Sequence, residues 1–372
     1  MKRIALWLLV VACLALWIAT SRAASGVEGV YIGTLGGIPV VVNLENADGD
    51  GTYFYRRVGR DIILQGKQND GVLALTETDA YATERARLEL KQNANGFNGT
   101  WSDLKKSRVL PVTLRRVTSG DLSALKFPVT PEFRRWQQES PFDALRFDQP
   151  FKPSSTVNVS GKRVQWLIEP KSGVRFPRLP DMNLSVNTAL SVEHYRIAAN
   201  ALQCPLEKPD GFTYTPSLSL YSSRLFSVNA SVDYYCGGAH PDNYEENTTL
   251  DLRTAKILRL EDLYRFVGGA VPVIQEKDYS PAQDVYDKAR AAKLVALILK
   301  QYGTLTKGVD KECKMVYDQE EGNGLAYLTW YLTAKGLVVQ SSFAHVAATC
   351  ENSYTLPYSV LKPYLAPNSP LR

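Results

Sequence analysis

The sequence has few of the residues that most often carry catalysis or bind metals. It contains three histidines in 372 residues, and no two of its five cysteines have the Cys-x-x-Cys spacing of redox and zinc motifs. It also lacks a convincing Gly-x-Ser-x-Gly or Ser-x-x-Lys motif for a nucleophilic serine. These absences favour a binding protein over an enzyme and indicate no cofactor.

A concentration of positive charge is also missing. The whole chain has a net charge of +5, but Lys2, Arg3 and Arg22 belong to a predicted leader, whose removal leaves 40 basic and 38 acidic residues. A protein that binds a phosphate backbone gains affinity by releasing counterions, which requires a concentrated basic surface. Nucleic acid is therefore not an expected partner.

The only long apolar run lies at the N-terminus. A basic start precedes the apolar segment 4–18, and small residues before Ala24 suit cleavage at that point. Residues 1–23 are therefore predicted to be a signal peptide, which leaves a periplasmic or secreted protein with no transmembrane helix in the mature chain. The alternative is a lipoprotein attached through Cys13, although the apolar run continues beyond that residue.

Four cysteines remain once the leader is removed. They are Cys204, Cys236, Cys313 and Cys350. An even number of cysteines in an exported chain favours disulfides over thiol chemistry, and three pairings are possible. We favour Cys204 with Cys236 and Cys313 with Cys350, because each pair brackets one compact stretch of sequence.

Residues 26–117 have the pattern of consecutive short strands. The expected strands are 27–33, 38–45, 52–57, 61–66, 72–77, 86–91, 96–102 and 109–116. Strong turn signals separate them, such as Asp-Gly-Asp-Gly at 48–51, and no helical period is present. This predicts an all-β antiparallel meander that closes into a small barrel. Trp101 is interpreted as core packing.

The remainder of the chain has a different composition. Residues 118–156 collect five prolines and are predicted to be a surface linker with a short helix near 131–138. Residues 157–366 mix strand patterns with helical patterns at 182–202 and 280–303, which predicts an α+β domain with an antiparallel sheet and two main helices. The apolar residues at 285, 289, 292, 296 and 299 share a helical period and are expected to face that sheet.

The segment 226–242 is the most informative part of this domain. Residues 226–236 alternate between apolar and polar, as expected of a strand with one buried face. The strand leads into Tyr235-Cys-Gly-Gly-Ala-His-Pro241, where two glycines predict a sharp turn that carries His240.

This region resembles the RsiV-like extracytoplasmic domain, found in RsiV-type anti-sigma factors and beside PdaC-type peptidoglycan deacetylases. The resemblance spans residues 183–365. It rests on the turn motif above together with Leu250-Asp-Leu-Arg-Thr-Ala-Lys256, Leu260-Glu-Asp-Leu263, and Gly336-Leu-Val338 running to Leu356-Pro-Tyr-Ser-Val-Leu361. It implies an extracytoplasmic α+β module, and in RsiV-type members that module recognises lysozyme.

The chain departs from the RsiV pattern in several ways. A leader stands where RsiV-type proteins carry a cytoplasmic sigma-binding segment and a membrane helix, and no deacetylase domain is present. The four cysteines and the predicted barrel are not part of the pattern either. The resemblance therefore implies a type of binding surface and not an inherited activity.

The predicted binding edge surrounds this turn. Its residues are Tyr235, Gly237, Gly238, His240, Asp242 and His345. The leading hypothesis is an exported, non-catalytic binding protein of the bacterial cell envelope that recognises a lysozyme-like hydrolase or a peptidoglycan fragment. The alternative is a cell-wall-directed hydrolase that uses His240 as a base or metal ligand, with His345 nearby.

Overall fold

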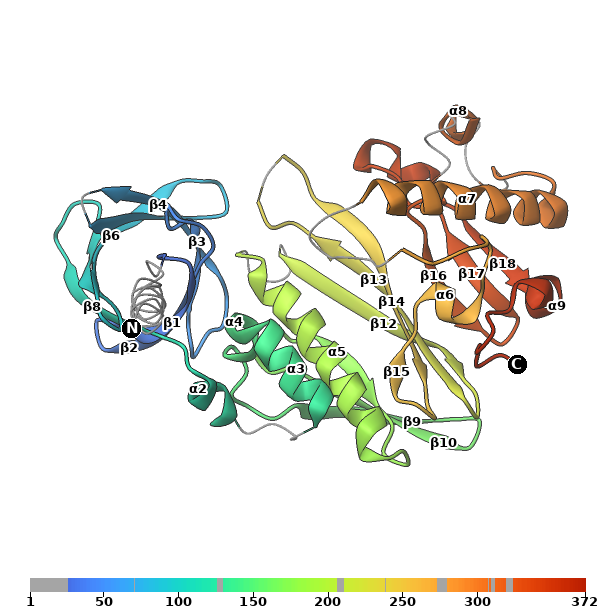
Figure 1. The fold of residues 1–372 in the computed structure, drawn as a ribbon, viewed down its shortest axis with the longest axis horizontal. Coiled ribbons are helices and arrows are strands. Elements are labelled where there is room, and N and C mark those ends of the chain that lie inside the picture. The colour runs from blue at the N-terminus through green and yellow to red at the C-terminus, as the bar shows by residue number, and fades with distance from the viewer. Residues whose placement is uncertain are drawn as a thin grey trace, which may run out of the picture. The chain divides into compact units, whose positions relative to one another are not determined.

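The chain divides into two compact units, which meet in sequence between Ala124 and Leu125. The structure is a computed structural model, and it describes residues 26–69, 71–125, 130–205, 211–237, 239–272, 280–306, 308, 312–318 and 324–372 (Figure 1). The predicted signal peptide, residues 1–23, and Cys13 within it lie outside the described residues. Among the helices in the described ranges, none is long and apolar enough to cross a membrane.

The first unit is a closed antiparallel barrel of eight strands. The strands are β1 (Gly29–Leu35), β2 (Ile38–Leu44), β3 (Gly51–Tyr55), β4 (Ile62–Asn69), β5 (Val72–Thr78), β6 (Glu84–Asn93), β7 (Gly96–Asp103) and β8 (Val109–Arg116). Each strand pairs with the next, and β8 pairs back onto β1. The predicted all-β meander and its closure into a barrel are confirmed. The strands end at the turn signals read from the sequence.

Large apolar side chains pack together in the barrel. Val40, Val42 and Leu44 of β2 are buried, and they join a cluster with Tyr31, Phe97 and leucines from the other strands. The period-2 alternation of a strand places these residues on one face of the sheet. Trp101 packs against this cluster, and its Nε1 donates a hydrogen bond of 2.9 Å to Glu77.

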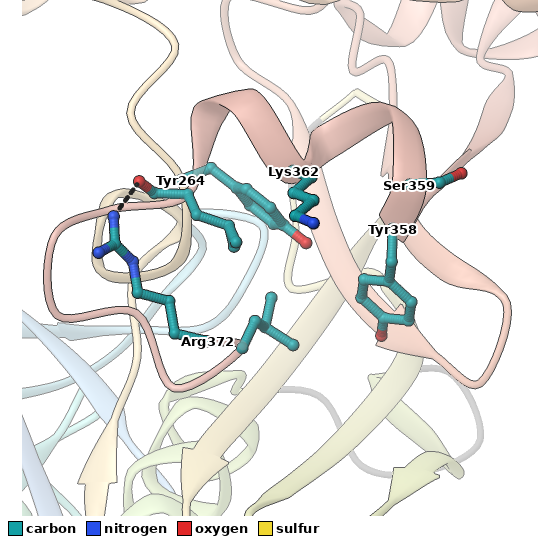
Figure 2. Close-up of a pocket in the computed structure, with 7 residues that line it drawn as sticks. Tyr264, Tyr358, Ser359, Lys362 and Arg372 are labelled. Atoms are coloured by element: carbon teal, nitrogen blue, oxygen red, sulfur yellow. Dashed lines mark hydrogen bonds between the residues drawn. The ribbon is translucent and has the colours of Figure 1, made fainter.

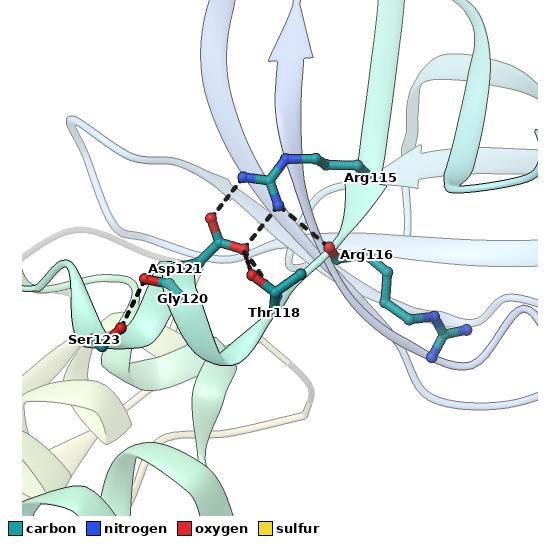
Figure 3. A network of polar contacts seen from close by, with 6 residues as sticks. All are labelled: Arg115, Arg116, Thr118, Gly120, Asp121 and Ser123. Carbon is teal, nitrogen blue, oxygen red and sulfur yellow. Dashed lines mark hydrogen bonds and ion pairs between the residues drawn. The ribbon is translucent and has the colours of Figure 1, made fainter.

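A short helix, α2 (Ser119–Ser123), follows the last barrel strand. Arg115 at the end of β8 makes a two-pronged ion pair with Asp121, with N–O distances of 2.7 and 2.6 Å (Figure 3). The same carboxylate accepts hydrogen bonds from the backbone N–H and hydroxyl of Thr118. Such charge-assisted, bidentate contacts fix the direction in which the chain leaves the barrel.

The second unit is an α+β domain. Its elements are α3 (Pro131–Glu139), α4 (Pro141–Ala144), β9 (Lys152–Val159), β10 (Lys162–Ile168), β11 (Arg175–Arg178), α5 (Leu184–Gln203), β12 (Phe212–Tyr221), β13 (Leu225–Tyr234), β14 (Asp242–Asp251), β15 (Lys256–Ile257), α6 (Leu260–Leu263), α7 (Pro281–Tyr302), α8 (Cys313–Asp318), β16 (Thr329–Thr333), β17 (Gly336–Gln340), η1 (His345–Cys350), β18 (Ser353–Pro357), α9 (Tyr358–Leu361) and η2 (Lys362–Tyr364). The predicted α+β class with antiparallel sheets and two long helices, α5 and α7, is confirmed.

Within the segment predicted as a surface linker, 118–156, residues from 130 onward contribute instead to the core of the second unit. Phe133 and Trp136 of α3 are buried. The ring of Trp136 stacks on that of Tyr195 in α5, with 5.7 Å between centroids. The ring centroid of Phe147 lies 4.7 Å from that of Tyr195. Two of the five prolines that suggested a linker begin helices, since Pro131 is the first residue of α3, which the Thr130 hydroxyl caps, and Pro141 is the first residue of α4. Strand β9 also begins within the segment, at Lys152.

Residues 152–168 form a β-hairpin. Strands β9 and β10 pair in antiparallel fashion around Ser160 and Gly161, which have φ angles of +51° and +77°. Two consecutive residues with positive φ form the type of turn that fits the twist of a two-residue hairpin.

The α7 helix buries a different face from the one expected. Its limits agree with the predicted 280–303, because Ser280 accepts a hydrogen bond from the Gln283 backbone and Gly303 ends the helix with φ of +76°. Val285 and Leu299 of the predicted stripe, however, are 68% and 43% exposed. The buried stripe contains Tyr286, Arg290, Ala291, Leu294 and Ile298. It faces a core shared with β16, β17 and β18.

The β12–β13–β14–β15 sheet is covered on both faces. Helix α5 packs on one face, where Thr248 of β14 donates a hydrogen bond of 3.0 Å to Glu193. On the other face, the backbone N–H of Leu332 in β16 donates to the hydroxyl of Ser227 in β13. Strands β13 and β14 therefore lie between α5 and the β16–β17–β18 sheet, with the turn that joins them at one end.

Candidate binding surface on the β13–β14 hairpin

A disulfide ties the β13–β14 turn to the end of α5. Cys204 follows α5, Cys236 lies in the turn, and their Cα atoms are 4.8 Å apart. A second disulfide joins Cys313 of α8 to Cys350 at the end of η1. The favoured pairing is thus the one in the structure, and two disulfides are typical of an oxidising compartment outside the cytoplasm.

Three of the predicted binding residues, Tyr235, Gly237 and His240, are described residues of this turn. The Tyr235 backbone N–H donates to the Gly211 carbonyl at 2.8 Å, and Gly237 has a φ of +101°, which glycine adopts without strain. His240 is exposed, and its Nδ1 lies 3.1 Å from the Pro241 carbonyl oxygen. Gly238 lies outside the described residues.

The remaining two predicted residues lie at the ends of neighbouring elements. Asp242 begins β14 opposite Tyr234, whose hydroxyl donates to its carboxylate at 3.5 Å. His345 begins η1, and its side chain falls outside what the structure describes. The predicted approach of His345 to His240 therefore stays a prediction.

Four carboxylates gather where β13, β14 and the end of η1 meet. They form the acidic edge: Asp233, Asp242, Glu245 and Glu351. The negative charges of Glu351 and Asp233 both act on Glu245. The negative charge of Asp242 acts on Glu351. Glu351 was not predicted, because its proximity to β14 depends on how the last sheet packs and not on sequence spacing.

The environment of the acidic edge disfavours negative charge on two of its members. Burial raises the pKa of Glu245, and the charges of Glu351 and Asp233 raise it further. Burial likewise raises the pKa of Glu351, with Asp242 adding to the shift. Neutral groups supply the hydrogen bonds: Asn229 donates to Glu245 at 2.8 Å, and the Phe343 backbone N–H donates to Glu351 at 3.1 Å.

No basic side chain of the described residues forms an ion pair with Asp233, Glu245 or Glu351. The opposite face of the same strand differs, because Glu246 is paired with Arg196 of α5. Successive residues of a strand point to opposite faces. Glu245 and Glu246 are therefore adjacent in sequence but differ in role, since Glu246 is neutralised within the fold and Glu245 is not.

Tyrosines lie on both faces of β14, and Tyr244 is on the face of Glu246. Tyr234 and Tyr244 form an edge-to-face pair with centroids 5.8 Å apart. Burial raises the pKa of the Tyr331 phenol in β16, and the negative charge of Glu245 raises it further. Tyrosine is enriched at protein interfaces because it combines a large apolar ring with a hydrogen-bonding hydroxyl.

The described residues contain no group of three or more His, Cys, Asp or Glu side chains placed to hold a metal ion. The third histidine, His194, is buried in α5 and stacks on Phe151 at 4.1 Å between ring centroids. Its Nε2 lies 2.9 Å from the Val174 carbonyl oxygen, so it serves the core of the second unit.

Comparisons with known proteins give limited information. No family model matches the sequence, and no curated protein matches it. Among solved structures, the crystal structure of a member of the DUF3298 family (BF2082) from Bacteroides fragilis is similar over 59% of this chain and 94% of that chain. The sequence identity is 14% and the TM-score is 0.33, so no site residue or activity is transferred from it.

Proposed function

We propose that this chain is an exported, non-catalytic binding protein of the bacterial cell envelope whose acidic edge recognises a basic, lysozyme-like hydrolase. The observation that carries this proposal is the gathering of Asp233, Asp242, Glu245 and Glu351 at one end of the β13–β14 sheet. A basic partner would relieve the mutual repulsion of these carboxylates, so the contact is favourable for both surfaces.

The charge balance around the edge supports a cationic partner. Burial and neighbouring carboxylates raise the pKa values of Glu245 and Glu351, so the negative charge of each is unfavourable in the fold. An arginine or lysine from a partner would supply the missing counter-charge at a site that is already partly desolvated. Interactions of this kind are worth more than ion pairs between fully exposed groups.

The rigidity of the edge supports binding without chemistry. Cys204–Cys236 holds the turn and Cys313–Cys350 holds the segment that leads to Glu351. A surface fixed before binding loses less conformational entropy when a partner docks. Tyr331 beside Glu245 and Tyr234 beside Asp242 provide apolar contact area of the type found in interface centres.

The sequence resemblance adds independent support. The turn motif at 235–241 and the Leu250–Lys256 segment resemble the RsiV-like extracytoplasmic domain, whose RsiV-type members recognise lysozyme. We infer that the acidic edge is the part of the present chain that would meet such a partner, because it adjoins the turn motif.

A capture experiment tests this function. The mature chain is immobilised and exposed in parallel to purified c-type lysozyme, which is basic, and to purified peptidoglycan sacculi. We expect retention of lysozyme by the wild type and its loss in the Glu245→Gln/Glu351→Gln double variant. Glu139→Gln, which removes one exposed carboxylate from α3, is the control and should retain lysozyme. Retention of sacculi alone would assign the chain to the wall polymer instead.

A further inference from the structure

A second candidate site lies within the second unit, beside α9 and η2. It is a pocket of about 760 Å³ (Figure 2). Its lining residues are Tyr264, Tyr358, Ser359, Lys362, Leu365, Leu371 and Arg372. A volume of this size falls within the range of pockets that hold small organic ligands, about 300–1,000 Å³.

The walls of this pocket are joined by backbone hydrogen bonds. Tyr264 and Leu365 form an isolated antiparallel bridge. On either side of it, the Arg265 backbone N–H donates to Tyr364 at 2.6 Å, and the Ala366 N–H donates to Leu263 at 2.9 Å. The segment after α6 and the segment after η2 therefore form one preformed wall, as is usual for ligand sites.

The interior of the pocket is mainly apolar. Leu365 and Leu371 contribute aliphatic side chains, and Tyr264 and Tyr358 contribute aromatic rings. Figure 2 shows the rings of Tyr264 and Tyr358 bordering the same space, which Leu365 and Leu371 also line. Contact with such a surface favours the hydrocarbon part of a ligand.

The charged side chains of the pocket are both positive. Lys362 and Arg372 line it, and no aspartate or glutamate does. Arg372 donates one hydrogen bond to the Leu365 carbonyl at 3.4 Å, and neither cation forms an ion pair with a carboxylate of the described residues. The local potential therefore favours an anion.

A buried hydroxyl also faces this pocket without a partner. Tyr264 is 1% exposed, and its Oη makes no hydrogen bond within the described part of the chain. Figure 2 shows the phenol pointing toward the space between Lys362 and Tyr358. A buried polar group without a hydrogen bond destabilises the fold, and a ligand oxygen would remove that cost by accepting a hydrogen bond from it. Burial raises the pKa of this phenol, so it is a neutral donor at physiological pH.

We propose that this pocket binds a small amphipathic carboxylate, such as a medium-chain fatty acid. The carboxylate would lie between Lys362 and Arg372 and accept a hydrogen bond from the Tyr264 hydroxyl, while the hydrocarbon chain packs on Leu365, Leu371 and the tyrosine rings. This site is separate from the acidic edge and does not depend on the function proposed for it.

Calorimetric titration of the mature protein with sodium decanoate, and with 1-decanol at matched low concentration, tests this site. We expect decanoate to bind at least about tenfold more tightly than decanol, because the charged hydrogen bonds require the carboxylate. Lys362→Gln and Arg372→Gln should each weaken decanoate binding about tenfold. Lys293→Gln, which removes an exposed charge from α7, should leave the affinity unchanged.

Tyr264→Phe separates ligand binding from folding. This variant keeps the ring and removes only the unpartnered hydroxyl, so the ligand-free protein should unfold at the same or a higher temperature than the wild type. Its affinity for decanoate should fall about fivefold or more. Equal affinity for decanoate and decanol, or unchanged decanoate affinity in the properly folded Tyr264→Phe variant, would overturn the proposal.

Discussion

Glu245 of β14 and Glu351, which directly follows η1, lie far apart in sequence, yet the charge of Glu351 raises the pKa of Glu245. Packing of β16 against β13 and β14 brings the two carboxylates within electrostatic range. The Cys313–Cys350 disulfide then fixes the residue adjacent to Glu351. The fold therefore holds like charges together at an edge where a soluble monomer would gain by separating them.

Glu245→Gln should stabilise the protein at neutral pH. The raised pKa means that the folded state binds more protons than the unfolded state at pH values above the ordinary carboxyl value of 4.5. Stability from this group is thus lost as pH rises through the folded pKa. Because the group is partly exposed, we expect a gain of less than about 1 kcal/mol at pH 7 that vanishes below pH 4.5.

Urea denaturation of wild type and Glu245→Gln between pH 4 and 7 measures this difference. Glu139→Gln serves as the exposed control on α3, and its stability should follow that of the wild type throughout. A variant that is destabilised at pH 7 would show that Glu245 is neutralised in the folded chain, contrary to our account.

His194 should make the second unit sensitive to mild acid. Burial lowers the pKa of its imidazole well below the ordinary 6.5, and the nearby Arg178 charge lowers it further. The unfolded chain therefore binds a proton below pH 6.5 and the folded chain does not, so stability falls as pH falls, by about 1.4 kcal/mol per pH unit.

His194→Gln should be less stable at pH 7, because it loses the stacking on Phe151, but its stability should change less between pH 6.5 and 5 than that of the wild type. Denaturation curves at several pH values give both slopes. Identical slopes for the two proteins would show that His194 is protonated without cost in the fold.

The two disulfides should contribute similar amounts to stability. They close segments of 32 and 37 residues, and loop-closure entropy depends only weakly on such a difference. Replacing either pair by alanine should cost about 3–4 kcal/mol in free energy of unfolding. The intact mass of the mature protein should rise by the mass of four hydrogens on full reduction, and no change in mass would contradict both bonds.

Trp136→Ala tests the assignment of α3 to the second unit. The side chain is 8% exposed and stacks on Tyr195, so truncation should cost about 3–5 kcal/mol. The loss should affect only the unfolding transition of the second unit and leave the barrel transition in place. Arg135→Ala, on the exposed face of the same helix, is the matched control and should change little. A stable Trp136→Ala variant would restore the linker interpretation.

The barrel could be predicted almost strand by strand because its turns are marked locally. Glycines and Asp-Gly pairs stand where strands end, and each strand pairs with its neighbour in sequence. The cysteine pairing and the caps of α7 were equally local features. In each case the residues on which the prediction depends lie within one helix or strand, or at the two ends of one continuous stretch of sequence.

The rest depends on long-range packing, which periodicity does not encode. Val285 and Leu299 belong to a regular apolar pattern along α7, but in the structure the face of the helix with Tyr286 and Leu294 packs into the core. The turn at 235–241 was found from its glycines, whereas Glu351 joins the edge only because the last sheet covers β13 and β14. The orphaned hydroxyl of Tyr264 has no sequence signal at all.

Titration of a basic c-type lysozyme into the mature chain at a series of salt concentrations tests the central claim most directly. We predict saturable binding that weakens as salt rises, because a partly desolvated acidic edge attracts a cationic surface. The Glu245→Gln/Glu351→Gln variant should bind at least about tenfold more weakly, and Glu139→Gln should match the wild type. Absence of binding at low salt, or equal affinity of wild type and the folded double variant, would contradict the account.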